Sequence, residues 1–443
     1  MSGRINARGF LKQAAVCAAL LPIPALLPGV ARAADGDRPN FILCMTDDQG
    51  WGDVSYNEQG RLARGAFKTT ELDQMAAAGL RFDRFYAAAP VCSPTRGSCL
   101  TGRHPFRYGV TSPGRPLKLE EKTLAQALGA AGYKTGHFGK WHLNGISGPG
   151  KPIAKNDPLN PGAFGFQTWF SVSNFFEADT TFSRNGETVK TQGDGSDVIV
   201  GEALRWLDDL KTKGSGGPFL AVIWFGNPHT PHKPLPADAQ ATGGNPELGE
   251  IAGVDRAMGT LRRGLRERGL AQNTMLWFNS DNGRPGDNTP LKGGKGGISE
   301  GGIRVPGICE WPARIKPGRT SIPVVTSDFY TTLLDAAGVP QPADKPAPQD
   351  GISLMPLLDG NMRERPAPIG FMNGNTTALS DNRYKLVTGK DGKQLYDLTA
   401  DPGETRDLSA EQPDVVTRMS KLLDDWTASV HKSRSGADYP ATR

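Results

Sequence analysis

Cysteine, histidine and long apolar runs are all scarce in this chain of 443 residues. Five cysteines are too few for a scaffold held together by disulfides. The apolar run near the N-terminus is broken by Pro22, Pro24 and Pro28, so no membrane-spanning helix is expected there. Internal repeats and low-complexity tracts are also absent. With 37% hydrophobic residues, the chain is typical of a globular protein with one large α/β domain, alone or with a small second domain.

Residues 1–33 have the composition of an export signal. Basic residues precede a short apolar run, and a small-residue cleavage site ends at Ala33. The segment ARGFLK is similar to a twin-arginine signal without its first arginine, so the Sec and Tat-like routes both stay open. We expect a periplasmic or secreted protein. Loss of this segment, which holds four basic residues and no acid, lowers the formal net charge from +5 to +1. The remaining charge does not support binding to nucleic acid.

Apolar runs alternate with amphipathic segments along most of the chain. Strands are predicted at 40–46, 218–225 and 275–280, and helices are predicted to be capped by Thr70 and Thr123. This alternation predicts an α/β fold with a mostly parallel sheet covered by helices on both faces.

The chain changes character after a proline-rich stretch at 339–351. Two short predicted strands, RYKLV and KQLYDL, and a final helix over 413–430 indicate a small α+β subdomain. We therefore divide the chain into a signal peptide at 1–33, a catalytic domain at 34–340, and a linker with the C-terminal subdomain at 341–443.

Carboxylates follow two of the predicted strands, at the point where each strand ends. One strand runs into Asp47 and Asp48, and another runs into Asp281 and Asn282. Ligands of such sheets bind at the carboxyl ends of the strands, and carboxylates packed together need a cation to neutralise them. Oxygen ligands without histidine or cysteine favour Ca²⁺ or Mg²⁺ over Zn²⁺. Each motif alone is more typical of a turn or a cap, but the two together predict a metal site.

Histidine and lysine side chains cluster after two other predicted strands. GHFGKWH carries Lys140 and His142, and NPHTPHKP carries His229. Of the histidines we favour these two for proton transfer, and we expect His137 and His232 to be structural. The glycine-rich stretch 291–306 contains Lys295, and its backbone could close around an anion. The alternative is that this stretch is a flexible surface loop. It does not fit the P-loop pattern.

Cys92 stands in an unusual setting, CSPTRGSCLTGR. A thiol phosphatase would need an arginine six residues downstream, where Ser98 stands. A Cys–His protease would have no use for an acidic metal cluster, and a thiolate is a poor ligand for Ca²⁺. The surroundings suit an oxygen nucleophile on the cation, near a helix N-terminus, with Arg96 one turn later. Disulfide pairing of Cys92 with Cys99 is excluded by about two turns of helix, whereas nothing in the spacing requires or forbids a Cys44–Cys309 bridge.

Together these segments resemble the sulfatases of the alkaline phosphatase superfamily, the type I sulfatases that depend on formylglycine. Cys92, Pro94 and Arg96 match their C-x-P-x-R motif, and LTGR continues it as in the family. PNFILCMTDDQGWGD, GKWHL, FNSDNG and GGKGGISEGGIRVP match further family segments, and LYDLTADPGETRDL is similar to the C-terminal subdomain. TTELDQ lacks the proline usual at its second position. The resemblance covers nearly the whole mature chain and includes arylsulfatases and N-acetylgalactosamine-6-sulfatases.

The resemblance implies a mechanism in which a maturation enzyme oxidises Cys92 to formylglycine (3-oxoalanine). One hydroxyl of the hydrated aldehyde attacks sulfur to form a covalent sulfate ester. His229 then protonates the leaving alkoxide, and His142 deprotonates the second hydroxyl to expel sulfate. Arg96, Lys140 and Lys295 would stabilise the sulfuryl oxygens. A divalent cation, usually Ca²⁺ in this family, would be held by Asp47, Asp48, modified Cys92, Asp281 and Asn282.

The expected reaction is hydrolysis of sulfate esters, and export favours a sulfated carbohydrate as substrate. Alternatives are an arylsulfatase, a formylglycine-dependent phosphonate monoester or phosphodiester hydrolase, and a secreted carbohydrate-binding protein whose cysteine is never converted. For substrate contacts, the chain offers Arg284, Asp287, Asn288 and Arg383.

Overall fold

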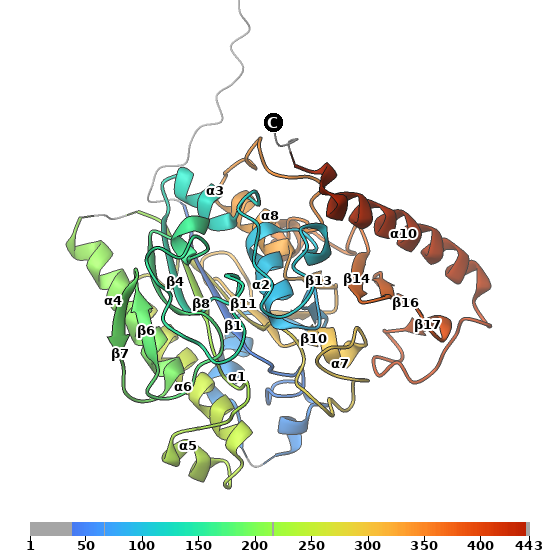
Figure 1. Cartoon of the computed structure of the whole chain (residues 1–443). Helices are drawn as coiled ribbons and strands as arrows, with labels where there is room; N and C mark the ends of the chain where they lie inside the picture. The colour runs from blue at the N-terminus through green and yellow to red at the C-terminus, as the bar shows by residue number, and fades with distance from the viewer. Residues whose placement is uncertain (1–37, 66, 215–216, 440–443) are drawn as a thin grey trace, which may run out of the picture.

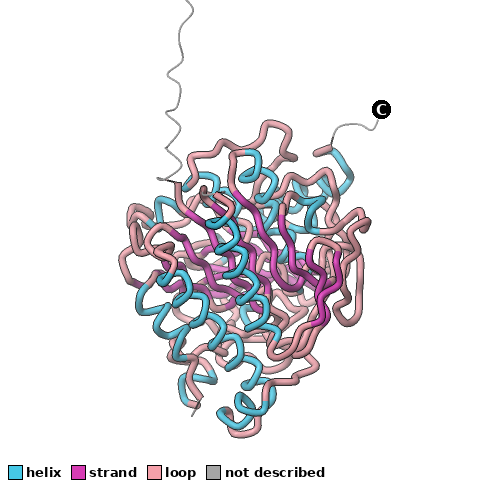
Figure 2. The backbone as a smooth tube through the Cα atoms, turned by 90° about the vertical axis from the view of Figure 1, so that its left-hand side faces the viewer, coloured by secondary structure: helices cyan, strands magenta, loops and turns pink. Residues whose placement is uncertain are grey.

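A ten-stranded sheet forms the centre of the computed structural model, which describes residues 38–439 except 66 and 215–216 (Figures 1 and 2). Its middle strands are parallel, and antiparallel strands extend it on both sides. In spatial order the strands are β12 (Gly318–Thr320), β2 (Leu80–Phe82), β11 (Gly307–Glu310), β9 (Thr274–Ser280), β1 (Asn40–Thr46), β8 (Phe219–Trp224), β4 (Lys134–Lys140), β5 (Thr168–Val172), β6 (Thr181–Arg184) and β7 (Glu187–Lys190). The predicted α/β class with a mostly parallel central sheet is confirmed.

Helices cover both faces of this sheet, and in Figure 2 some of them lie in front of its strands. Alternate residues of β1 point to opposite faces: Phe41 and Leu43 belong to one core, and Ile42 and Cys44 to the other. Strands buried on both faces must be apolar throughout, which explains the unbroken run that predicted this strand. The helices are α1 (Thr70–Ala78), α2 (Cys92–Thr101), α3 (Leu124–Ala130), α4 (Gly195–Thr212), α5 (Pro236–Ala241), α6 (Pro246–Glu267), α7 (Glu300–Ile303), α8 (Asp328–Ala336), α9 (Met355–Leu358) and α10 (Pro413–Lys432).

Of the two predicted helix caps, one is correct. Thr123 caps α3 and forms a reciprocal capping box with Gln126. Thr70 is instead the first residue of α1, and Thr69 takes the N-cap position without a side-chain cap. The Thr69 hydroxyl bonds the side chains of Ser55 and Asp73, so tertiary contacts have replaced the local cap.

A second, four-stranded antiparallel sheet lies toward the C-terminus, beside α10 (Figure 1). The sequence predicted β16 (Tyr384–Gly389), β17 (Gly392–Asp397) and the helix, but it missed β14 (Ile369–Asn373) and β15 (Thr376–Ser380). Leu379, Leu386 and Leu395 of this sheet pack against Met419 and Leu423 of α10. A smaller three-stranded sheet contains β10 (Arg304–Val305), β3 (Phe85–Tyr86) and β13 (Val324–Val325).

The four cysteines in the described part of the chain are all free and buried. Cys44 and Cys309 are core residues of β1 and β11, and they form no bridge. Among the described residues, no helix combines the length and the apolar character needed to cross a bilayer. The predicted signal peptide at 1–33 lies outside the described residues.

Candidate active site

Two neighbouring parallel strands, β1 and β9, deliver the acidic residues to one edge of the sheet. Thr46 and Ser280 are paired at their carboxyl ends, so Asp47 and Asp281 follow side by side. The Asp281 amide donates to the Thr46 carbonyl at 3.1 Å, and the Asp48 amide donates to Oδ1 of Asp281 at the same distance. Asp48 has a left-handed backbone, with φ of 67°, which turns the chain sharply at this point.

The three aspartates and Cys92 form one buried cluster. One ligand atom from each lies within 4.8 Å of the others. Asn282 donates its side-chain amide to Oδ1 of Asp48 at 2.7 Å, while its own Oδ1 is buried without a hydrogen-bond partner among the described residues. An oxygen-rich cluster beside an unsatisfied amide oxygen fits a hard divalent cation such as Ca²⁺ or Mg²⁺.

Cys92 is the first residue of α2, and its Sγ lies 3.4 Å from Oδ1 of Asp47. Every residue of this helix is buried, so the thiol is held in place from all sides. The helix ends at Gly102, whose φ of 70° is the left-handed cap that favours glycine. Arg103 then anchors that end through buried ion pairs with Glu121 and Asp438.

Arg96 lies one turn into α2, with a fully buried guanidinium. Its Nη2 is 2.7 Å from Oδ2 of Asp281 and 3.7 Å from Oδ1 of Asp47. The guanidinium also lies over the ring of Trp224, at 5.1 Å from the ring centre. Arg96 therefore links α2 to both acidic strand ends.

Lys140 and His142 come from the end of β4. Gly139 has φ of 100°, and a Cβ there would lie 1.9 Å from the Trp224 carbonyl oxygen, so only glycine allows β4 to approach β8 here. Lys140 Nζ consequently reaches Oδ2 of Asp47 at 2.5 Å. Burial, followed by the charges of Lys140 and Arg96, holds the pKa of His142 well below its usual value, so this imidazole is neutral.

His229 and Lys295 approach the cluster from two loops. His229 follows β8, its Nε2 lies 3.8 Å from Oδ2 of Asp48, and its ring is stacked on Phe175 with 4.6 Å between centres. Lys295 Nζ lies 2.7 Å from the same Asp48 oxygen. The structure thus brings all ten predicted site residues to one edge of the sheet.

Three carboxylates face three cationic side chains in this site. Burial disfavours ionisation of Asp47, but its cationic neighbours, above all Lys140, hold its pKa well below the usual range. Burial and the nearby charge of Asp47 raise the pKa of Asp281 to about 7. A divalent cation among these carboxylates would leave the site positively charged, which suits an anionic substrate.

Other predicted residues lie away from this cluster or serve the fold. His137 is buried, bonds Ser171 at 2.7 Å, and packs against Trp141 and Trp224 in the core. Arg284, Asp287 and Asn288 line a separate pocket beside the acidic segment, and Arg284 is paired with Glu247. Arg383 directly precedes β16 of the C-terminal sheet and forms an ion pair with Asp397.

Two features of the site have little or no sign in the sequence. Phe175, whose ring stacks on His229, had no local signal. Lys385 of the C-terminal sheet lies buried between Glu300 and Glu404, at 3.0 and 2.9 Å, and so holds α7 at the end of the loop that carries Lys295. A lysine within the apolar strand RYKLV was the one available sign.

Comparisons with known proteins agree with this geometry. The sulfatase family profile matches residues 39–339, and the profile for the C-terminal part of N-sulphoglucosamine sulphohydrolase matches residues 295–429. Arylsulfatase A of Homo sapiens is 30% identical over 446 residues, covering 90% of this chain and 85% of that protein. N-acetylgalactosamine-6-sulfatase of Mus musculus is 32% identical over 414 residues, covering 83% and 74%.

Among solved structures, that of Ps i-CgsB in complex with k-i-k-neocarrahexaose has a TM-score of 0.79 at 26% identity, covering 88% of this chain and 92% of that one. The family match spans the acidic strand ends, the helix α2 that begins at Cys92, and the segment with Lys140 and His142. The chain therefore belongs to the sulfatase family and is a sulfuric ester hydrolase.

Proposed function

We propose that this sulfatase is exported and removes sulfate from carbohydrates, with formylglycine formed from Cys92 and with Ca²⁺ in the acidic cluster. The placement of the Cys92 Sγ, 3.4 Å from Asp47 among the carboxylates, carries the proposal. A sulfur atom is a poor partner for a hard cation, whereas the oxygens of a hydrated aldehyde at the same position are good ones. Conversion of the side chain therefore resolves the mismatch between the thiol and its surroundings.

The donor set favours Ca²⁺ over Mg²⁺. Asp47, Asp48, Asp281 and Asn282 would provide the protein ligands, and all of these side chains are buried. Mg²⁺ keeps several water molecules and strict octahedral geometry, whereas Ca²⁺ accepts a larger and less regular set of protein oxygens. The bound cation would polarise the sulfuryl group and the attacking hydroxyl.

The remaining side chains supply charge and proton transfer. Arg96, Lys140 and Lys295 would hold the sulfuryl oxygens, because their cationic groups all lie against the acidic cluster. His229 is in a position to donate a proton to the leaving alkoxide, with its ring orientation set by Phe175. His142, neutral and with a buried Nδ1 that lacks a partner, is suited to accept a proton.

A carbohydrate substrate is supported by the relatives and by the sequence. N-acetylgalactosamine-6-sulfatase is named for a sulfated sugar, and Ps i-CgsB was solved with a hexaose. The export signal predicted at 1–33 would place the enzyme where such glycans occur. Arylsulfatase A shows a comparable identity, so activity on aryl sulfates is the alternative.

Two measurements on protein purified from its own host test this proposal. Mass spectrometry of the peptide around residue 92 should show a residue in which one oxygen replaces the sulfur and two hydrogens of cysteine. A panel of sulfated galactose, hexosamine and aryl esters should show faster sulfate release from at least one sugar than from the aryl ester. An unmodified thiol in fully active protein would rule out the formylglycine, and a preference for the aryl ester would rule out the carbohydrate assignment.

A further inference from the structure

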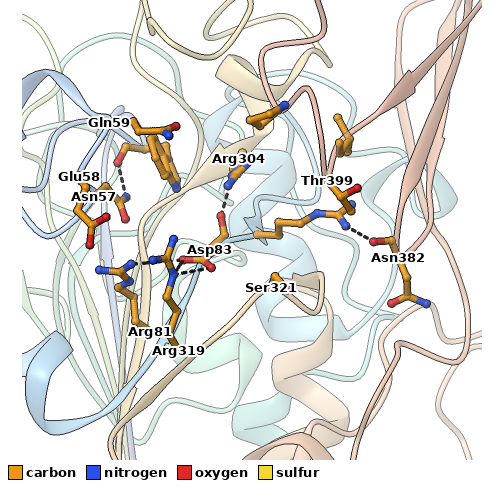
Figure 3. A pocket seen from close by; sticks show the side chains of 14 residues that line it. Asn57, Glu58, Gln59, Arg81, Asp83, Arg304, Arg319, Ser321, Asn382 and Thr399 are labelled. Atoms are coloured by element: carbon orange, nitrogen blue, oxygen red, sulfur yellow. Dashed lines mark hydrogen bonds and ion pairs between the residues drawn. The ribbon is translucent and has the colours of Figure 1, made fainter. Parts of the chain in front are cut away.

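A second pocket, of about 310 Å³, lies between the main sheet and the C-terminal sheet (Figure 3). Arg81, Arg304 and Arg319 surround Asp83 on one wall, and Asn382 and Thr399 of the C-terminal part face them. None of these residues belongs to the acidic cluster or to the groups around it. The pocket therefore needs an explanation of its own.

Strand register places this pocket on the same edge of the sheet as the catalytic cluster. Asn279 of β9 pairs with Gly307 of β11, and Ile308 pairs with Arg81 of β2. Asp83 therefore follows β2 at the edge where Asp281 follows β9. The two strands are separated by two strand spacings, about 10 Å in the plane of the sheet. A ligand larger than one sugar unit could thus extend from one site toward the other.

Several polar atoms in the pocket wall have no hydrogen-bond partner among the described residues. Arg304 Nη1, Arg81 Nε and Trp51 Nε1 are buried donors of this kind, and Asn57 Oδ1 is a buried acceptor. Arg304 and Trp51 are each 7% exposed, and the guanidinium lies 5.0 Å from the indole ring centre. Arg304 Nη1 also lies 3.7 Å from Glu300, too far for a hydrogen bond. These atoms are covered by the protein, so contacts to an occupant of the pocket would come from the more exposed groups of the same wall, above all Arg319.

The charges of the wall favour an anion. Arg319 Nε lies 2.7 Å from both carboxylate oxygens of Asp83, and Arg81 Nη2 is 3.6 Å from one of them. Arg304 donates to the Asp83 backbone carbonyl instead and leaves the carboxylate to the other two. In all, the pocket lining holds four guanidiniums, those of Arg81, Arg84, Arg304 and Arg319, against two carboxylates, those of Glu58 and Asp83. Guanidinium groups bind planar or tetrahedral oxyanions through paired N–H donors.

We propose that this pocket binds a sulfate group on a sugar unit of the same glycan whose sulfate ester is being cleaved. The proposal rests on the carbohydrate substrate proposed above. The exposed guanidinium of Arg319, with that of Arg81 beside it, would bond the sulfate oxygens, and the Trp51–Arg304 stack would form the floor of the pocket. The enzyme would then distinguish a multiply sulfated chain from a singly sulfated sugar by the spacing of its sulfates.

Kinetics of pocket variants test this assignment. Arg319→Ala is the primary variant, because its side chain is 56% exposed and its loss leaves no cavity in a core. Arg205→Ala on α4, where the side chain is 57% exposed, is the matched control. For a hexasaccharide of sulfated galactose units, Arg319→Ala should lower kcat/KM about tenfold, the range of one charge-assisted hydrogen bond. Hydrolysis of an aryl sulfate should be unchanged in both variants.

Arg81→Gln is a second variant with the same expectation, and thermal melting verifies that each protein is folded. Equal losses on the hexasaccharide and the aryl sulfate, or no loss on either, would overturn the proposal. If the wild-type enzyme cleaves only aryl sulfates, the proposal of a carbohydrate substrate is wrong. Whether the pocket binds a sulfated sugar is then decided by calorimetry.

Calorimetry on inactive Cys92→Ala protein separates the possible sources of the anion. The sulfated hexasaccharide should bind, and adding Arg319→Ala should weaken that binding about tenfold. The chemically desulfated hexasaccharide should bind more weakly than the sulfated one, and Arg319→Ala should have no further effect on its binding. If inorganic sulfate alone shows the whole dependence on Arg319, the pocket is a free-anion site and the glycan assignment is wrong.

Discussion

Arg96 and Asp281 form a fully buried ion pair of 2.7 Å across 185 positions of the sequence. The pair joins the helix that starts at Cys92 to the strand end that carries part of the acidic cluster. A buried ion pair contributes little to stability by itself, because desolvation offsets the attraction. Here its effect is on geometry, since it holds Cys92 and the acidic cluster in one arrangement.

Replacing Arg96 by lysine should therefore reduce activity more than stability. The ammonium keeps the charge but cannot reach both Asp281 and a sulfuryl oxygen with a planar fork. We expect kcat to fall about 100-fold, the scale for removing one preorganised donor, with a smaller change in KM. Steady-state kinetics on the preferred sulfate ester measure this. A KM effect alone would mean that Arg96 binds substrate without favouring the transition state.

Substitutions of Cys92 should separate chemistry from folding. Cys92→Ala should abolish sulfate release while leaving the circular dichroism spectrum unchanged, because the change is small and the helix is packed on all sides. Cys92→Ser should retain at most a trace, since a single hydroxyl cannot expel the sulfate ester once it has formed. Full activity in Cys92→Ala would remove this residue from the mechanism.

Removing the metal should affect both activity and stability. Dialysis against a calcium chelator should abolish turnover and lower Tm, because a cation that binds only the folded state adds about 2.7 kcal/mol at 100 times its Kd. Ca²⁺ should restore activity at lower concentration than Mg²⁺. Asn282→Ala should raise the Ca²⁺ concentration needed for half-reactivation about tenfold or more. Reactivation by Mg²⁺ at the lower concentration would contradict the assignment.

The acidic strand ends were predictable because the information is local. Asp47 and Asp281 directly follow apolar runs, and parallel strands must end at the same edge of a sheet. The surroundings of Cys92 in the sequence already placed it near the cation, whereas its direct approach to Asp47 depends on tertiary packing of α2, and its conversion to formylglycine was implied only by the resemblance to a family. Phe175 could not be predicted because its contact with His229 depends on how two loops pack.

Strands β14 and β15 were not predicted from the sequence, because they too depend on tertiary packing. β14 and β15 are five residues each and are joined by a turn at Gly374, so neither has a long apolar pattern. They become strands because Phe371 and Ala378 pack into a core with Tyr86 and Val325 of the main body. Pairing of this kind is decided by tertiary packing rather than by propensity.

Lys385 should be essential for the stability of the folded chain. Lys385→Met removes the cation between two buried carboxylates, those of Glu300 and Glu404, and leaves only the more distant Arg304 beside Glu300, which should cost about 3–5 kcal/mol. Because α7 follows the loop of Lys295, kcat/KM should fall as well in protein that remains folded. Urea unfolding measures the first effect. Lys393→Met, at an exposed position of the neighbouring strand, is the control and should change stability by less than about 1 kcal/mol. Equal effects of the two variants on the free energy of unfolding would show that the ion pairs of Lys385 with Glu300 and Glu404 do not stabilise the fold.

Glu250 of α6 should make stability depend on pH away from the active site. Burial, with smaller effects from Asp194 and Glu177, raises its pKa to about 8, while its Oε1 accepts the Lys233 amide at 2.6 Å. The folded state therefore holds a proton that the unfolded state has lost above its ordinary pKa of about 4.5. The stabilisation is complete below that pH and disappears as pH rises through about 8.

Glu250→Gln keeps the hydrogen bond to Lys233 and removes the ionisation. Relative to wild type, the variant should become more stable as the pH rises from 5 to about 8, by about 4 kcal/mol, and the difference should level off by pH 9. Urea unfolding at several pH values measures this difference, and Glu267→Gln, near the exposed end of the same helix, serves as the control. A difference between wild type and Glu250→Gln that stays constant across this range would show that Glu250 ionises normally in the folded protein.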